Sequence, residues 1–255
     1  MYYVTIAKTP KLLTHIAALA LLTVLFSAPA GAQKAGPTDK SAMQILQGMS
    51  DYLAKAGTIS FRARTFVDQV RKSGIKIKAA RQGRILLKRP NQLQVHSIAD
   101  NGAVRSVWFD GSKLTVVDRH LNQYKTLAFK GTTDALLDHL ADKYQVNLPI
   151  SDLLFSDVGK ALKESIISSE YLGVRTVQGV KCHHLSFEST GADWQIWIEA
   201  DKTPLPRRFA VTYVNTKGEP QYLAQLDRWS IGEKTDPSQF KAAVAKSAKK
   251  VPFGK

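Results

Sequence analysis

The chain has 255 residues, and its 36 Lys and Arg outnumber its 21 Asp and Glu, which gives a formal charge of +15 at pH 7. Such an excess favours anionic partners through long-range attraction. Cys182 is the single cysteine. An intramolecular disulfide and a zinc site made of several cysteines are therefore excluded.

The first 32 residues have the three parts of a secretory signal peptide. Lys8 and Lys11 supply the positive start, the apolar run 12–26 follows, and Ala30-Gly31-Ala32 ends the segment with small residues. The run is shorter than the roughly twenty residues that cross a bilayer as a helix. We predict cleavage after Ala32 or Ala30 and a periplasmic location, with an uncleaved membrane anchor as the alternative.

The first half of the remaining chain has the pattern of a β-meander. Residues 33–40 are small and polar and predict a flexible leader, and helical spacing predicts one amphipathic helix over 41–56. The period then changes to two, and Asn101-Gly102 and Asp110-Gly111 are strong hairpin signals. We predict antiparallel strands over 59–67, 75–88, 92–98, 104–109, 113–118 and 123–129.

A helical insertion separates this meander from a second one. Helical spacing covers 132–144, and shorter helical pieces are predicted at 150–155 and 158–162. Strands resume near Ser165 and continue to Trp229. We thus predict about ten strands in one α+β, mainly antiparallel domain over 41–231, followed by a basic, loosely ordered tail over 232–255.

The order of these elements and four local segments resemble a known bacterial family of predicted periplasmic proteins. The four segments are Val107-Trp108-Phe109-Asp110-Gly111-Ser112-Lys113-Leu114, Gly179-Val180 leading into Cys182-His183-His184-Leu185, Asp193-Trp194-Gln195-Ile196-Trp197-Ile198, and Leu205-Pro206-Arg207-Arg208. That family is related to the periplasmic lipoprotein carriers and lipid-binding lipoproteins of the LolA and LppX type. The resemblance implies a curved, unclosed half-barrel sheet with helices in its concave face and an apolar cavity between the two.

Through this resemblance, two apolar sets become candidates for binding a lipid. The first would form a lid and consists of Leu136, Leu137, Leu140, Leu153, Leu154 and Phe155. The second would line the cavity and consists of Phe61, Val67, Leu93, Val95, Trp194, Ile196, Ile198, Phe209, Val211 and Tyr213. Alternation does not tell which face of a sheet is concave, and ordinary core packing produces the same stripes.

Basic residues crowd the first predicted hairpin. Arg62, Arg64, Arg81 and Arg84 are candidates for a positive face that contacts an anionic membrane surface. A solvated strand face is the alternative interpretation. Nucleic acid is not an expected partner, because only Phe66 places an aromatic ring among these charges.

The sequence gives little sign of catalysis. On a strand, His183 and His184 point to opposite faces and cannot chelate one ion together, so we predict no metal site. Recognisable motifs for nucleophilic, metalloprotease, phosphate or dinucleotide chemistry are missing, and we expect no cofactor. A dispersed acid pair, Asp193 with Glu199 or Glu188, is the remaining enzymatic possibility.

Together these patterns predict a monomeric, non-enzymatic periplasmic protein that binds or carries a lipid or the acyl part of a lipoprotein. The helical insertion over 132–162 would act as its lid. Two alternatives stay open: an envelope protein-interaction or stress-sensing module on the same fold, and a hydrolase with a dispersed site.

Overall fold

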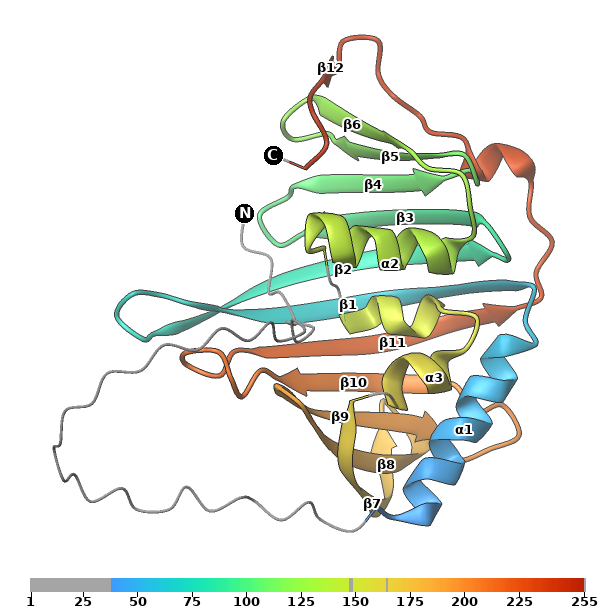
Figure 1. The fold of residues 1–255 in the computed structure, drawn as a ribbon, viewed down its shortest axis with the longest axis vertical. Helices are drawn as coiled ribbons and strands as arrows, with labels where there is room; N and C mark the ends of the chain where they lie inside the picture. Colours follow the sequence, from blue (N-terminus) through green and yellow to red (C-terminus); the bar gives the residue numbers. More distant parts are fainter. Residues whose placement is uncertain (1–37, 147–148, 164, 255) are drawn as a thin grey trace, which may run out of the picture.

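The computed structural model describes residues 38–146, 149–163 and 165–254, which form one curved sheet with helices on one face (Figure 1). The strands are β1 Thr58–Val70, β2 Lys76–Lys88, β3 Gln92–Ala99, β4 Val104–Phe109, β5 Lys113–Asp118, β6 Gln123–Ala128, β7 Ile166–Val177, β8 Val180–Ser189, β9 Ala192–Glu199, β10 Pro206–Thr212, β11 Gln221–Ile231 and β12 Lys249–Lys250. The helices are α1 Lys40–Ala54, α2 Thr133–Tyr144, η1 Pro149–Leu154, α3 Val158–Lys163 and η2 Pro237–Phe240. The predicted signal peptide over 1–32 lies outside the described residues.

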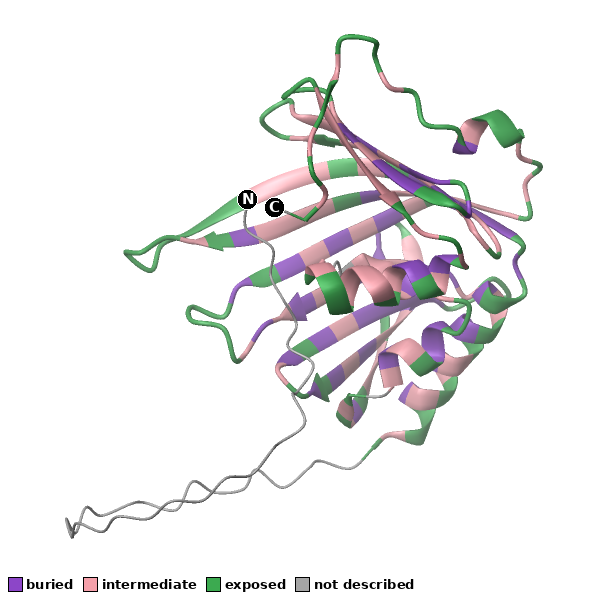
Figure 2. Cartoon of the chain, turned by 45° about the horizontal axis from the view of Figure 1, so that its top comes forward, coloured by how far each residue is buried: buried purple, intermediate pink, exposed green. Residues whose placement is uncertain are grey.

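The sheet joins the two predicted meanders side by side. Its strand order is β12-β6-β5-β4-β3-β2-β1-β11-β10-β9-β8-β7, and all pairs are antiparallel except β12 with β6. The pairing of β1 with β11 connects the halves at the centre of the sheet. Because β6 and β7 lie near opposite edges, the chain between them must cross the sheet, and it does so as α2, η1 and α3 on the concave side (Figures 1 and 2).

The turn between β4 and β5 illustrates why the hairpins form where the sequence predicts them. The Asp110 carboxylate accepts hydrogen bonds from the backbone N–H groups of Ser112 at 2.9 Å and Lys113 at 2.8 Å. Gly111 has a φ of 90°, in the region where a side chain would be strained. A short polar side chain and a glycine therefore close this hairpin through contacts that are local in the sequence.

The first helix is anchored by its N-cap residue. The Asp39 carboxylate accepts hydrogen bonds from the N–H of Ser41 at 2.7 Å and from the N–H of Tyr171 in β7 at 3.1 Å. These donors hold the pKa of Asp39 below its ordinary value. The same carboxylate thus caps α1 and fixes its start beside β7.

The predicted mainly antiparallel half-barrel is confirmed, but the tail differs from the prediction. The sheet has twelve strands rather than about ten, because Lys249 and Lys250 pair in parallel with β6. Phe240 in η2 is only 1% exposed, and Phe253 packs against the core. Residues 232–254 are therefore held along the sheet by two aromatic anchors. The small and basic residues around these anchors give no periodic signal, so the sequence pattern predicts a loose tail.

Candidate functional site

Strand register shows which residues share the concave face. Phe61 pairs with Ile85, Ile85 with Val95, and Val95 with Val107, so these residues form one row across four strands. Members of this row belong to the same apolar cluster as Leu46 of α1. The row therefore lies on the concave face of the sheet, which the helices cover. We call this set of buried and packed residues the concave cluster.

All ten residues of the predicted lining set belong to the concave cluster. Eight are buried and two are half-buried at its margin; the buried ones are Phe61, Leu93, Trp194, Ile196, Ile198, Phe209, Val211 and Tyr213, and the half-buried ones are Val67 and Val95. The alternation of each strand therefore places the whole set on the side that the helices cover.

Five of the six predicted lid residues reach the same cluster. Leu136, Leu153 and Leu154 are buried in it, and Leu137 and Leu140 pack against it. Phe155 is half-buried and does not belong to the cluster among the described residues. The other five lid residues thus join the same apolar cluster as the lining set.

Arg89 fastens the end of η1 to the turn that follows β2. Its guanidinium donates hydrogen bonds to the carbonyl oxygens of Leu154 at 3.1 Å and Phe155 at 2.8 Å. Burial lowers the pKa of Arg89, although nearby Asp134 acts in the opposite direction. The Asp134 carboxylate in turn accepts hydrogen bonds from the backbone N–H of Ser156, at 3.1 Å, and from its hydroxyl.

The other end of this segment docks on α1. The backbone N–H of Gly159 donates to the Ser50 hydroxyl at 2.7 Å, and Lys163 donates to the side chain of Gln47. A Cβ atom on Gly159 would lie 3.2 Å from the Cβ of Ser50, so α3 approaches α1 closely at this point. Residues 154–163 are thus held by a small number of polar contacts to separate elements and by the buried side chains of Leu154, Val158 and Leu162.

The segment η1 also carries an ionisable group, Asp152, whose surroundings change its pKa. Asp152 of η1 has its pKa raised to about 7 by burial. It faces the buried Tyr213 and Tyr222, whose own pKa values are raised by burial and, to a smaller extent, by the Asp152 charge. No hydrogen bond joins the Asp152 side chain to another described residue. Sequence reasoning missed Asp152 and the contact of Arg89 with η1, because a single charged residue carries no periodic signal.

The four predicted anionic-surface arginines do not share a face. Arg62 and Arg84 pair with each other across β1 and β2 on the convex side, as do Arg64 and Gln82. Arg81 pairs with Thr65 and lies on the concave side. The prediction of one positive face is therefore wrong for Arg81, because residues three apart on a strand point in opposite directions.

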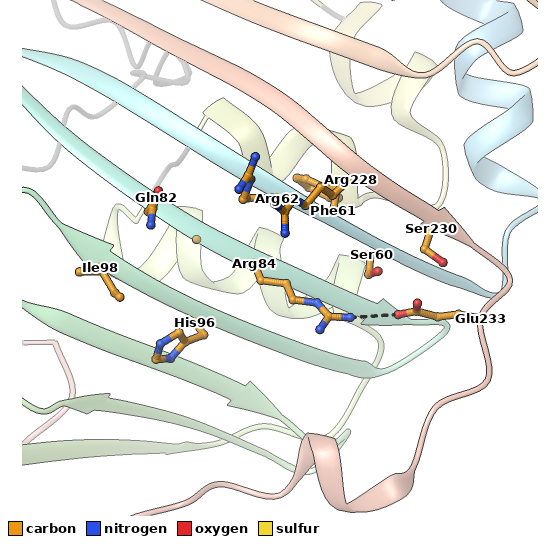
Figure 3. Close-up of a pocket in the computed structure, with 11 residues that line it drawn as sticks. Ser60, Phe61, Arg62, Gln82, Arg84, His96, Ile98, Arg228, Ser230 and Glu233 are labelled. Carbon is orange, nitrogen blue, oxygen red and sulfur yellow. Dashed lines mark ion pairs between the residues drawn. The ribbon is translucent and has the colours of Figure 1, made fainter.

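Arg62 and Arg84 line a pocket of about 420 Å³ (Figure 3). Arg62 makes a two-point ion pair with Asp227 at 2.6 and 2.5 Å, and Arg84 lies 3.5 Å from Glu233. Arg228 reaches the pocket from a bulge in β11, where its φ is 52°. Two of these arginines are partly neutralised by carboxylates, which weakens the convex side as an anion-binding surface.

The Cys182-His183-His184 segment has structural contacts on both faces. His183 bonds to the hydroxyl of Tyr171 at 2.9 Å, whereas His184 stacks on Trp197 with ring centroids 4.1 Å apart on the other face. The predicted opposition of the two histidines is confirmed. Burial raises the pKa of the Cys182 thiol and lowers that of His184.

Of the two acid pairs suggested by the sequence, the structure brings one together. Asp193 pairs with Glu188 across β8 and β9, and burial together with Glu188 raises the pKa of Asp193. Glu199 lies at the far end of β9 and forms an ion pair with Arg207 at 2.5 Å. In the described ranges no three His, Cys, Asp or Glu residues are grouped as a metal site.

These features define an α+β half-barrel whose concave apolar face is covered by helices. Residues 42–254 match the family described as predicted periplasmic protein (DUF2092), so the chain belongs to that family and is periplasmic. None of the described helices is long and apolar enough to cross a membrane. No curated protein matches the chain.

Several solved structures are similar at low identity. The lipoprotein LppX of Mycobacterium tuberculosis is 12% identical with a TM-score of 0.47, covering 78% of this chain and 99% of LppX. An uncharacterized conserved protein from Thermus thermophilus is 12% identical with a TM-score of 0.49, covering 84% of this chain and 100% of that one. A chain of the MucA/MucB complex of Pseudomonas aeruginosa is 15% identical with a TM-score of 0.40, covering 80% of this chain and 61% of that one.

Proposed function

We propose that the protein is a non-enzymatic periplasmic binding or carrier protein that holds the acyl chain of a lipid or lipoprotein between the concave cluster and residues 132–162. The observation that supports this most is how the covering residues are held against the sheet. The lining and lid residues belong to one apolar cluster, which also takes in Val158 and Leu162, and residues 154–163 add a small number of polar contacts to neighbouring elements. We call residues 132–162 the cover. Because none of its described residues belongs to a strand, the cover can separate from the sheet without breaking any strand pairing.

The balance of energies favours a long-chain ligand. An intramolecular hydrogen bond contributes a net 0.5–1.5 kcal/mol, so the five hydrogen bonds of Arg89, Asp134 and Ser50 together hold the cover by roughly 2.5–7.5 kcal/mol. Each buried methylene contributes about 0.8 kcal/mol, so ten of them contribute roughly 8 kcal/mol. A long acyl chain that replaces the leucine contacts can therefore offset the cost of opening, whereas a short one cannot.

A disulfide between α1 and α3 tests whether this cover moves. Ser50→Cys with Gly159→Cys, in a Cys182→Ala background, joins positions whose Cβ atoms lie close to the roughly 3.5–4.5 Å typical of disulfides. After loading with a fluorescent fatty acid and oxidation, we expect the ligand to stay bound but to stop exchanging. Reduction of the same protein is the matched control and should restore exchange. Normal exchange by the oxidised protein would rule out a moving cover.

A second candidate function, recognition of an envelope protein, is favoured by one observation. The β1–β2 hairpin extends beyond its neighbours (Figure 1), and it carries Ile75 and Ile77 with exposed fractions of 64% and 43%. Exposed apolar residues at a projecting tip are typical of contact surfaces. If this function holds, crosslinking in intact periplasm will give one defined adduct that disappears in the Ile75→Ser, Ile77→Ser double variant.

A further inference from the structure

One end of the concave face is polar rather than apolar. Thr65 pairs with Arg81, Ser97 with Arg105, and Arg105 with Asp118, so these five residues extend across β1 to β5. The Arg81 guanidinium donates to the Ser97 hydroxyl at 3.0 Å, and Arg105 donates to the Asp118 carboxylate at 3.0 Å. We call these five residues the arginine end.

The arginine end lies on the same side of the sheet as the concave cluster. Thr65 follows the buried Ala63 by two residues along β1, and Ser97 follows Val95 by two along β3. Residues two apart on a strand point to the same face. A strand rises about 3.3 Å per residue, so Ile85 and Leu87 of the cluster lie roughly 13 and 20 Å from Arg81 along β2. This span is comparable with an extended long acyl chain.

Among the five residues of the arginine end, two arginines stand beside one aspartate. Arg105 has a carboxylate partner in Asp118, but the side-chain hydrogen bond of Arg81 goes to a neutral hydroxyl. Burial lowers the pKa of Arg81, and the neighbouring Arg105 lowers it further, while Asp118 and Asp100 act in the opposite direction. A half-buried guanidinium that bonds only to a neutral group among the described residues is costly unless an anion is supplied.

The arginine end is also accessible. The side chains of Arg105 and Asp118 retain exposed fractions of 35% and 18%, and Arg81 is half-buried. An arginine guanidinium presents paired N–H donors that match a carboxylate or phosphate at two points. The concave face thus offers a polar, cationic end and an apolar body in one continuous row.

We propose that the arginine end binds the anionic head group, a carboxylate or phosphate, of an acyl ligand whose chain lies along the concave cluster. This inference rests on the proposed function, because it names the chemical class of ligand for the same site. It assigns Arg81 as the main head-group contact and Arg105 as a second donor. The convex arginines play no part in it.

The test compares oleoyl lysophosphatidate, neutral 1-oleoylglycerol and glycerol 3-phosphate as ligands of the mature protein. Arg81→Gln is the informative variant, and Arg84→Gln is its matched control on the opposite face of β2. We expect the wild type and Arg84→Gln to bind the anionic lipid about tenfold more tightly than the neutral one. One charge-assisted hydrogen bond contributes about 1.5 kcal/mol, which corresponds to this change in affinity. Arg81→Gln should lose this preference and still bind 1-oleoylglycerol, which shows that it is folded.

Each other outcome has a distinct meaning. Equal binding of both oleoyl compounds by all three proteins would overturn the head-group site and leave the proposed function intact. Binding of glycerol 3-phosphate as tightly as the lipid would overturn it in favour of a site for soluble phosphate. Failure of the wild type to bind any oleoyl compound would overturn the proposed function itself.

Discussion

Asp152 is the residue whose chemistry contrasts most with its surroundings. It lies in η1, against the concave cluster, and burial raises its pKa from 3.8 to about 7. The folded chain therefore retains a proton that the unfolded chain releases. The stabilising effect of this proton is complete at low pH and is lost as the pH rises from 3.8 to about 7, because the charged carboxylate is poorly accommodated in the fold.

Replacing Asp152 by Asn should remove this pH dependence. One pKa unit corresponds to about 1.4 kcal/mol, so we expect Asp152→Asn to gain about 3 kcal/mol more over the wild type at pH 8 than at pH 4.5. Urea unfolding at both pH values measures the difference. Asp138→Asn, at an exposed position of α2, is the control and should follow the wild type. A constant gap between Asp152→Asn and wild type would show that Asp152 does not titrate in this range.

Arg89 is expected to control how easily the cover opens. Arg89→Ala removes two hydrogen bonds and leaves the carbonyl groups of Leu154 and Phe155 without these donors. We expect a loss of about 1–3 kcal/mol in the free energy of unfolding and faster uptake of a fluorescent fatty acid. Arg71→Ala, in the exposed β1–β2 turn, is the control. Lower stability with unchanged uptake would mean that Arg89 is structural only.

At the scale of elements, prediction succeeded where the determinants were local. The hairpins were predictable because Asp110 and Gly111 fold their own turn, and α2 because its N-cap and leucine stripe lie close together in sequence. The end of the chain was not predictable, because β12 and η2 are fixed by pairing with β6 and by the burial of Phe240. Those contacts join segments that are far apart in the sequence.

The tail should therefore contribute to stability. Phe240→Ala removes a side chain that is 1% exposed, and such substitutions in cores cost about 3–5 kcal/mol. We expect a loss at the lower end of this range or slightly below it, because η2 lies at the margin of the sheet. Thermal unfolding with Lys241→Ala as the exposed control measures this effect. A transition for Phe240→Ala that matches the wild type would support the sequence-based prediction of a loose tail.

For the whole molecule, the candidate site was predictable in composition but not in geometry. Alternation selected the lining residues, yet only the register of β1 to β4 showed that they face the helices. The same register separates Arg81 from Arg84, which a sequence inspection had grouped. Arg89 meets Leu154 across 65 positions of the chain, and no local pattern reports a contact of that kind.

The central claim is that the concave face holds an acyl ligand, and mass spectrometry of organic extracts from the mature protein tests it most directly. The protein should be purified from a bacterial periplasm without detergent, beside a secreted control of similar charge, and its organic extract analysed for lipid. We predict a stoichiometric acyl lipid that is absent from the control. An empty protein that also fails to take up a fluorescent fatty acid would contradict the claim and favour recognition of an envelope protein.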